Sequence, residues 1–326
     1  MTLSAPIQFS HVYSSAPWGG GWIRSLFART DAPSICSESW EISGHKFGLS
    51  VVQDGPYAGL SLAEMTEEFG AKLVGTKAPD PHRFPLLLKL LDARRSLSVQ
   101  VHPNENNAVL TAGEPKTEAW IVLAAAPGAA LYAGVRPGVT EADFRQAAEQ
   151  GEAVVGLLSR HEVKEGDAVY IPGGVVHAIG AGCLIYEVQQ SSNTTYRLYD
   201  WDRVNAFGNG RPLHIDQAFK SIDFKFPSIH LHRARNENHV GANVWRTFVH
   251  TPFFTVRELD LRDEITLDMD GSTFISVFVL DGGMKVSTEG GVCEVMRGSS
   301  VLVPACAGQC KFAAQISSTR ALVTTL

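Results

Sequence analysis

The stretch Gly166-Asp-Ala-Val-Tyr-Ile-Pro-Gly-Gly-Val-Val-His177 decides the fold that we predict for this chain. It contains a turn glycine, a short apolar strand, a tight exit at Pro172 and Gly174, and then a histidine. Glycine and proline bound strands in this way. A lone histidine is more often a hydrogen-bonded core residue, but the complete pattern predicts that His177 points into a β scaffold as a metal ligand, because neutral imidazole binds metals.

The rest of the chain consists mostly of short apolar runs separated by Gly, Pro and Asp. This spacing is typical of an all-β sandwich or barrel. The clearest of these runs are FPLLLKLLD (84–92), SLSVQVHP (96–103), EAWIVLAA (118–125) and CLIYEVQQ (183–190).

Two helical insertions interrupt the predicted strands, one from Leu62 to about Val74 and one from Thr140 to about Leu158. In the second, Thr140 and Asp143 have the spacing of a capping box. We expect Gly151 and Gly156 to break this second stretch, because glycine destabilises a helix interior.

A sequence pattern that occurs twice in the chain predicts a duplicated β unit. Residues 166–172 resemble residues 298–304, each with a glycine, a short strand and a proline at the same offset. Eleven residues after the glycine stands His177 in the first copy and Gln309 in the second, so we predict a metal site in the first copy alone. The polar segment 230–239 is predicted to link a catalytic domain, residues 1–230, to a β domain without metal, residues 231–326.

Further candidate ligands lie upstream of His177. Gln100 and His102 are two apart in a predicted strand and therefore share a face. Glu118 begins another apolar run, where a carboxylate could complete a metal site. Each of these side chains alone could simply face water. Together they form a mixed N/O set without cysteine, which suits a catalytic metal with room for substrate.

Composition limits the possible partners. The chain has 326 residues, 44% of them hydrophobic, and a net charge of −6, which argues against nucleic acid as a partner. No run approaches the roughly 20 apolar residues that span a bilayer. The five cysteines are odd in number and scattered, as in a cytoplasmic protein with reduced thiols.

Five segments together resemble type I mannose-6-phosphate isomerase in its shorter bacterial form, a member of the cupin superfamily. They are SWEIS, KLLDARRSLSVQVHP, GEPKTEAW, VYIPGGVVHAIG and YEVQQSSNTTYRLYDWDR. The resemblance implies a mainly β fold with two cupin-type jelly-roll barrels and helical insertions in the first. It also implies a Zn²⁺ enzyme that interconverts mannose 6-phosphate and fructose 6-phosphate through an enediol.

The resemblance also assigns roles. Zinc ligands are carried over to Gln100, His102, Glu118 and His177, and catalytic roles to Arg197, Lys116 and Lys89. A lysine could act as the base if burial and a nearby cation lowered its pKa. Strand alternation could turn Glu187 inward toward substrate. Arg203 is our candidate for the phosphate, since longer members of the family have a lysine at that offset. A surface ion pair of Arg203 with Asp200 or Asp202 is the alternative.

One departure from the family concerns Asn193, where an aspartate is usual four residues before the arginine. An amide cannot accept a proton from carbon, so activity or substrate choice could differ. Two other functions stay open at this point, a cupin iron dioxygenase and a sugar-phosphate-binding protein without catalysis. We expect a small-molecule sugar phosphate as partner, no nucleic acid, no membrane, and a monomer or homodimer.

Overall fold

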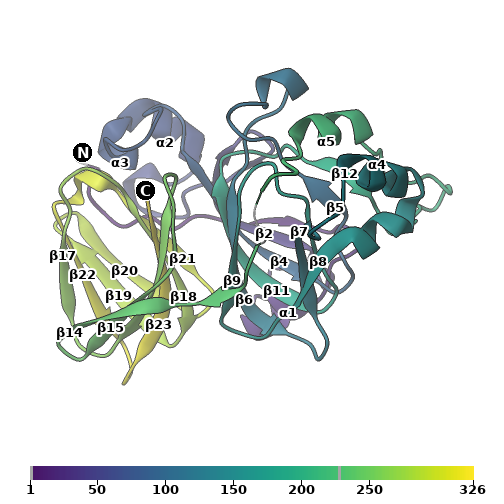
Figure 1. Ribbon diagram of the computed structural model, residues 1–326. Helices are drawn as coiled ribbons and strands as arrows, with labels where there is room; N and C mark the ends of the chain where they lie inside the picture. The colour runs from purple at the N-terminus through teal and green to yellow at the C-terminus, as the bar shows by residue number, and fades with distance from the viewer. Residues whose placement is uncertain (1–2, 227–228) are drawn as a thin grey trace.

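The computed structural model describes residues 3–226 and 229–326, and two β units lie side by side in it (Figure 1). The first unit holds an eight-stranded and a five-stranded sheet, and the second a six-stranded and a four-stranded sheet. The predicted mainly β fold is confirmed. The expected closed barrels are not found among the described residues, because each sheet keeps edge strands, such as β1 and β13 in the largest sheet.

The first unit contains the strands from the N-terminal two thirds of the chain. Its eight-stranded sheet runs in the order β1 (Val12–Ser14), β2 (Glu38–His45), β4 (Leu86–Ala93), β11 (Cys183–Gln190), β6 (Glu118–Ala125), β9 (Asp167–Ile171) and β13 (His232–Arg233), with β3 (Gly48–Leu49) paired to β2. Its five-stranded sheet runs β12 (Tyr196–Tyr199), β5 (Val99–Val101), β10 (His177–Ile179), β7 (Ala130–Val135) and β8 (Leu158–Glu162).

The second unit repeats the two-sheet plan with fewer strands. Its six-stranded sheet runs β14 (Arg235–Val240), β15 (Asn243–His250), β16 (Thr255–Leu261), β23 (Thr319–Thr325), β18 (Ile275–Asp281) and β21 (Ser300–Val303). Its four-stranded sheet runs β17 (Ile265–Asp268), β22 (Gln309–Ala314), β19 (Gly283–Thr288) and β20 (Gly291–Met296).

Both predicted helical insertions are confirmed. The first is α2 (Leu62–Phe69) followed by α3 (Ala71–Val74). The second is α4 (Glu141–Glu149), which begins at the predicted capping box of Thr140 and Asp143. The chain breaks at Gly151, whose φ is +67°, whereas Gly156 lies inside the 3₁₀ turn that follows. The other helices are α1 (Trp22–Leu26), α5 (Ile215–Ser221), η1 (Gly55–Tyr57), η2 (Val109–Thr111), η3 (Gly151–Leu157) and η4 (Ala305–Ala307).

The predicted linker is built differently from our expectation. The polar residues 230–239 contribute to two strands, β13 on the sheet of the first unit and β14 on the sheet of the second. The chain therefore changes units between Arg233 and Arg235. Polarity in this segment reflects edge strands, which face solvent on at least one side.

The two units share packed surface. Tyr186 of β11 stacks on Phe278 of β18 with ring centroids 5.0 Å apart. Beside them, the buried Arg29 side chain is paired with Glu41 at 2.8 Å and also donates to the carbonyl oxygen of Gly298. The seam is therefore part of the core and fixes the second unit against the first. No helix in the described part of the chain is long and apolar enough to cross a membrane.

Candidate metal and substrate site

Sheet register brings the predicted site residues together. On the five-stranded sheet, His177 of β10 lies opposite Gln100 of β5, and Gln100 lies opposite Arg197 of β12. On the facing sheet, Glu187 of β11 lies opposite Lys89 of β4. The two sheets of the first unit thus hold polar side chains between them, where a core would otherwise be apolar.

Two glycines allow the loop before β10 to pack closely on the end of β5. Gly174 has φ of +97°, a conformation that side chains with a Cβ rarely adopt, and its N–H donates to the carbonyl oxygen of His102 at 2.8 Å. A Cβ at Gly173 would lie 2.6 Å from the carbonyl oxygen of Pro103. The G-G pair in the sequence pattern therefore sets the position of His177 relative to His102.

His102, Glu118 and His177 form a compact buried cluster whose ligand atoms all lie within 4.8 Å of one another. The Nε2 atom of His177 is 3.3 Å from Oε1 of Glu118, and the Nε2 atom of His102 is 3.7 Å from its Oε2. The Gln100 amide lies 3.3 Å from Nε2 of His177. All four predicted ligands are therefore neighbours.

The hydrogen bonds of the two histidines turn their lone pairs toward this centre. Nδ1 of His102 donates to the carbonyl oxygen of Thr194 at 2.7 Å, and Nδ1 of His177 donates to that of Val175 at 2.9 Å. Each Nε2 is then an acceptor. Burial lowers the pKa of His177 to about 3 and also lowers the pKa of His102, so both rings are neutral.

Glu118 adds a carboxylate that lacks a full set of partners. Its Oε1 atom is buried and accepts no hydrogen bond among the described residues. Burial raises the pKa of its carboxyl to about 7. This Oε1 atom and Nε2 of His177 are both acceptors and lie 3.3 Å apart, which is unfavourable unless a cation lies between them. This donor set, two imidazoles and a carboxylate, fits zinc, and exchanging the ends of the Gln100 amide would add an oxygen.

Two lysines lie beside the cluster. Lys116 donates to Oε2 of Glu118 and lies 3.1 Å from Nε2 of His102. Lys89 is paired with Glu187 at 3.2 Å and with Glu38 at 3.5 Å.

The pKa of Lys89 contradicts one expectation from the sequence. Burial lowers it, but Glu187 and Glu38 outweigh burial, so the net shift is upward. The lowered pKa that a lysine base requires is therefore not found at Lys89, because two carboxylates surround it.

A polar cavity of about 310 Å³ opens next to the cluster. Five predicted site residues line it, as do Glu38 and Asn193. These five are Gln100, Lys89, Lys116, Glu187 and Arg197. Glu187 accepts a hydrogen bond from the Trp120 ring at 2.9 Å, which fixes its position. The cavity therefore offers substrate a route to the metal ligands.

The arginines at the cavity differ from the prediction. Arg203 does not line this cavity, and its guanidinium is bonded to Asp200 and to the carbonyl oxygen of Ser96. Arg211 does line it. No sequence pattern pointed to Arg211, because it stands alone in a polar loop after Gly208 and Gly210, and only the fold brings that loop to the site.

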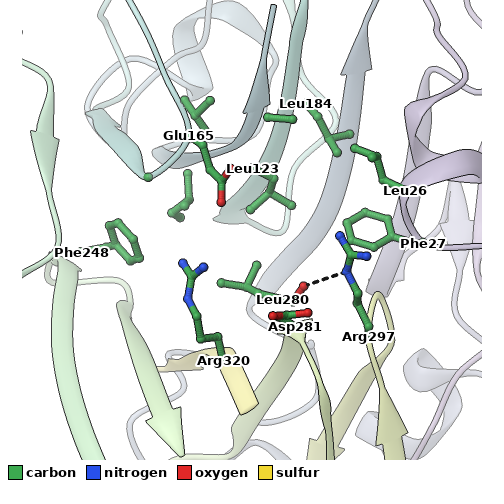
Figure 2. Close-up of a pocket in the computed structure, with 14 residues that line it drawn as sticks. Leu26, Phe27, Leu123, Glu165, Leu184, Phe248, Leu280, Asp281, Arg297 and Arg320 are labelled. Atoms are coloured by element: carbon green, nitrogen blue, oxygen red, sulfur yellow. Dashed lines mark hydrogen bonds between the residues drawn. The ribbon is translucent and has the colours of Figure 1, made fainter. Parts of the chain in front are cut away.

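A second cavity of about 320 Å³ lies at the seam between the units (Figure 2). Glu165 approaches it from the first unit, and Asp281, Arg297 and Arg320 from the second. Arg297 donates to the carbonyl oxygen of Leu280 at 3.2 Å. Its two carboxylates and two guanidinium groups balance in charge, and none of the predicted site residues lines it. The candidate site is therefore the cavity beside the histidines.

The second unit lacks the cluster. Gln309 begins β22 just as His177 begins β10, so the two residues occupy equivalent places in the repeated sequence pattern and in the structure. The Gln309 amide is exposed and donates to Asp268 at 2.9 Å. Among residues 3–226 and 229–326, the one group of His, Cys, Asp or Glu side chains that could hold a metal is that of the first unit.

Comparison with known proteins assigns the chain to a family. Residues 7–120 match the family described as "Phosphomannose isomerase type I, catalytic domain", and residues 245–322 match "Mannose-6-phosphate isomerase, cupin domain". The chain is 35% identical over 308 residues to the mannose-6-phosphate isomerase ManA of Bacillus subtilis, covering 94% of this chain and 95% of that protein. It is 34% identical over 309 residues to the probable mannose-6-phosphate isomerase GmuF of the same organism, with 94% and 96% covered.

A solved structure agrees with these sequence matches. The crystal structure of the mannose 6-phosphate isomerase from Bacillus subtilis superimposes with a TM-score of 0.87 and 29% identity, covering 99% of this chain and all of that one. Both β units are therefore those of one known enzyme architecture. The chain belongs to the type I mannose-6-phosphate isomerase family.

Proposed function

We propose that this enzyme interconverts mannose 6-phosphate and fructose 6-phosphate with a zinc ion held by Gln100, His102, Glu118 and His177. The observation that carries the proposal is the buried cluster of acceptors beside a polar cavity. A bound zinc ion would act as a Lewis acid on the substrate oxygens and stabilise the negative charge of an enediolate.

The chain's own residues would handle charge and protons. The reaction moves a proton between C2 and C1, and its barrier is the weak acidity of a C–H bond beside a carbonyl group. Lys89 keeps its proton because two carboxylates surround it, so it can stabilise developing negative charge on oxygen. Lys116 lies 3.7 Å from Glu187, and this pair could pass the proton between the two carbons.

Arg197 would stabilise the oxygens from the other sheet. Its Nη1 donates to the carbonyl oxygen of Pro212 at 2.9 Å, while its buried Nε has no hydrogen-bond partner among the described residues. The family's usual aspartate would offer a carboxylate near this arginine, and Asn193 offers an amide. We therefore propose that substrate oxygen, instead of a carboxylate, satisfies Arg197 in this enzyme.

The test is a coupled assay with the purified chain. After metal removal and reloading with zinc, mannose 6-phosphate should yield fructose 6-phosphate, and metal analysis should find zinc in the active protein. Tight binding of mannose 6-phosphate without turnover would indicate a binding protein instead. Iron together with dioxygen consumption would indicate a dioxygenase. The cytoplasmic location, and a monomer or homodimer, stay predictions.

A further inference from the structure

Positive charge is in excess among the arginines at this cavity. Arg197 and Arg211 both line it, and Arg203 lines the adjoining pocket together with Arg211. One buried carboxylate, Asp200, is paired with both Arg203 and Arg211. Two of the three guanidinium charges are therefore left without a compensating carboxylate in this group, and an anion is the ligand that balances them.

Arg211 differs from Arg203 in how it is held. Its Nε donates to Oδ2 of Asp200 at 2.7 Å and its Nη2 to Oδ1 at 2.5 Å, which fixes the plane of the guanidinium. In the described part of the chain its Nη1 makes no hydrogen bond, and the side chain is 33% exposed. Arg203, by contrast, bonds to backbone or to Asp200 through all three nitrogens and is 15% exposed.

The cavity reaches both the proposed metal ligands and Arg211. Gln100 and Arg211 both line it. Arg197 lies opposite Gln100 in the sheet register, whereas Asp200, which holds Arg211, follows the end of β12 that runs away from His102. In a hexose 6-phosphate the reacting C1 and C2 and the phosphate are at opposite ends of the sugar. A substrate whose carbonyl end faces the histidines would therefore direct its phosphate toward Arg211.

We propose that Arg211, oriented by Asp200, is the residue that makes this site specific for the 6-phosphate. The inference rests on the proposed isomerase function. A guanidinium held by a carboxylate on one edge and free on the other presents N–H donors in a fixed plane, the geometry that recognises phosphate oxygens. Arg203 then helps to hold Asp200 in place and does not contact the phosphate.

The experiment compares Arg211→Ala, Arg211→Lys and a control, Arg235→Ala, whose side chain is exposed on β14. We expect Arg211→Ala to raise KM for mannose 6-phosphate about 30-fold, because a hydrogen bond from a charged donor to the phosphate is lost. Its kcat should change less than about threefold, because uniform binding is lost and not transition-state binding. Arg211→Lys should recover part of the affinity, and Arg235→Ala should match the parent.

Inorganic phosphate provides a readout that does not depend on turnover. Its dissociation constant, measured by calorimetry on the zinc-loaded protein, should rise in Arg211→Ala by the same factor as KM. An unchanged phosphate affinity, or a loss of kcat at constant KM, would overturn the assignment of Arg211. If the parent protein binds phosphate through Arg211 but makes no fructose 6-phosphate, the isomerase proposal fails while the phosphate site stands. Zinc content and circular dichroism of each variant check that the fold is intact.

Discussion

The same strand–turn–strand segment occurs in both β units but serves a different purpose in each. In the first unit, β9 and β10 place the fully buried His177 in a polar space between the sheets. In the second, β21 and β22 place Gln309 at the surface, and the space between the sheets is filled by apolar residues such as Val277, Met284 and Phe312. The scaffold therefore does not require the metal ligands, and a unit with an apolar interior needs none.

The largest expected effect comes from His177→Ala in the first unit. Zinc should be lost and activity should fall at least about 1000-fold, because Lewis-acid stabilisation worth several kcal/mol disappears. The β fold should persist, as it does in the second unit without such a histidine. Metal stoichiometry, fructose 6-phosphate formation and circular dichroism are the measurements, with Gln309→Ala as the matched control. Full zinc content in His177→Ala would contradict the ligand assignment.

The seam between the units gives the next largest effect. Glu41→Ala leaves Arg29 buried without its carboxylate, and we expect the free energy of unfolding to fall by about 3 kcal/mol. Urea unfolding measures this loss. Glu162→Ala is the control, since its pair with Arg160 is exposed and should matter by less than about 1 kcal/mol. Equal effects of the two substitutions would mean that the seam pair does not join the units.

The same pair predicts a pH dependence. Burial raises the pKa of Glu41, but Arg29 and His11 outweigh burial, and the net pKa is lowered. A lowered carboxyl pKa stabilises the folded state above the unfolded-state value of about 4.3, and this stabilisation is lost as pH falls through the folded-state pKa. The stability difference between the parent and Glu41→Ala should therefore be constant near neutral pH and shrink below about pH 4. A difference that grew on acidification would contradict this sign.

A smaller effect tests the weak ligand of the first unit. Gln100→Leu should reduce zinc affinity about 10-fold, the lower end of the effect of residues that support a metal site. Gln100→His should retain or raise the affinity, because imidazole is a better zinc ligand than an amide oxygen. Competition with a chromophoric chelator measures both. Unchanged affinity in Gln100→Leu would remove the amide from the ligand set and leave His102, Glu118 and His177.

The smallest effect is expected when the missing imidazole is put into the second unit. Gln309→His should leave a single zinc ion per chain and change stability by less than about 0.5 kcal/mol, since residue 309 is exposed. The reason is that Asp268 would be the one carboxylate bonded beside an imidazole at this exposed position, and no metal-holding group is found among the described residues of the second unit. A second bound zinc would show that the two units differ by one residue only.

The cupin-type fold and the candidate ligands could be predicted from sequence because their signals are local. Turn glycines, period-two strands and the spacing from Gly166 to His177 depend on neighbours along the chain. Residues 230–239 do pass from the first unit to the second, but their polarity could not show that they do so as two edge strands. The sequence also could not show that these jelly rolls stay open, since closure depends on pairing between distant strand edges.

The sequence by itself determined that Gln100 and His102 share a face and that Glu118 and His177 each begin a strand, four side chains with the chemistry of metal ligands. Only the tertiary structure decided that Lys89 keeps its proton between two carboxylates and that Arg211 faces the cavity where Arg203 does not. The physical reason is how far apart in the chain the interacting residues lie. A turn or a strand forms from interactions between residues close in the chain, whereas a pKa or a binding surface depends on charges brought together from distant segments.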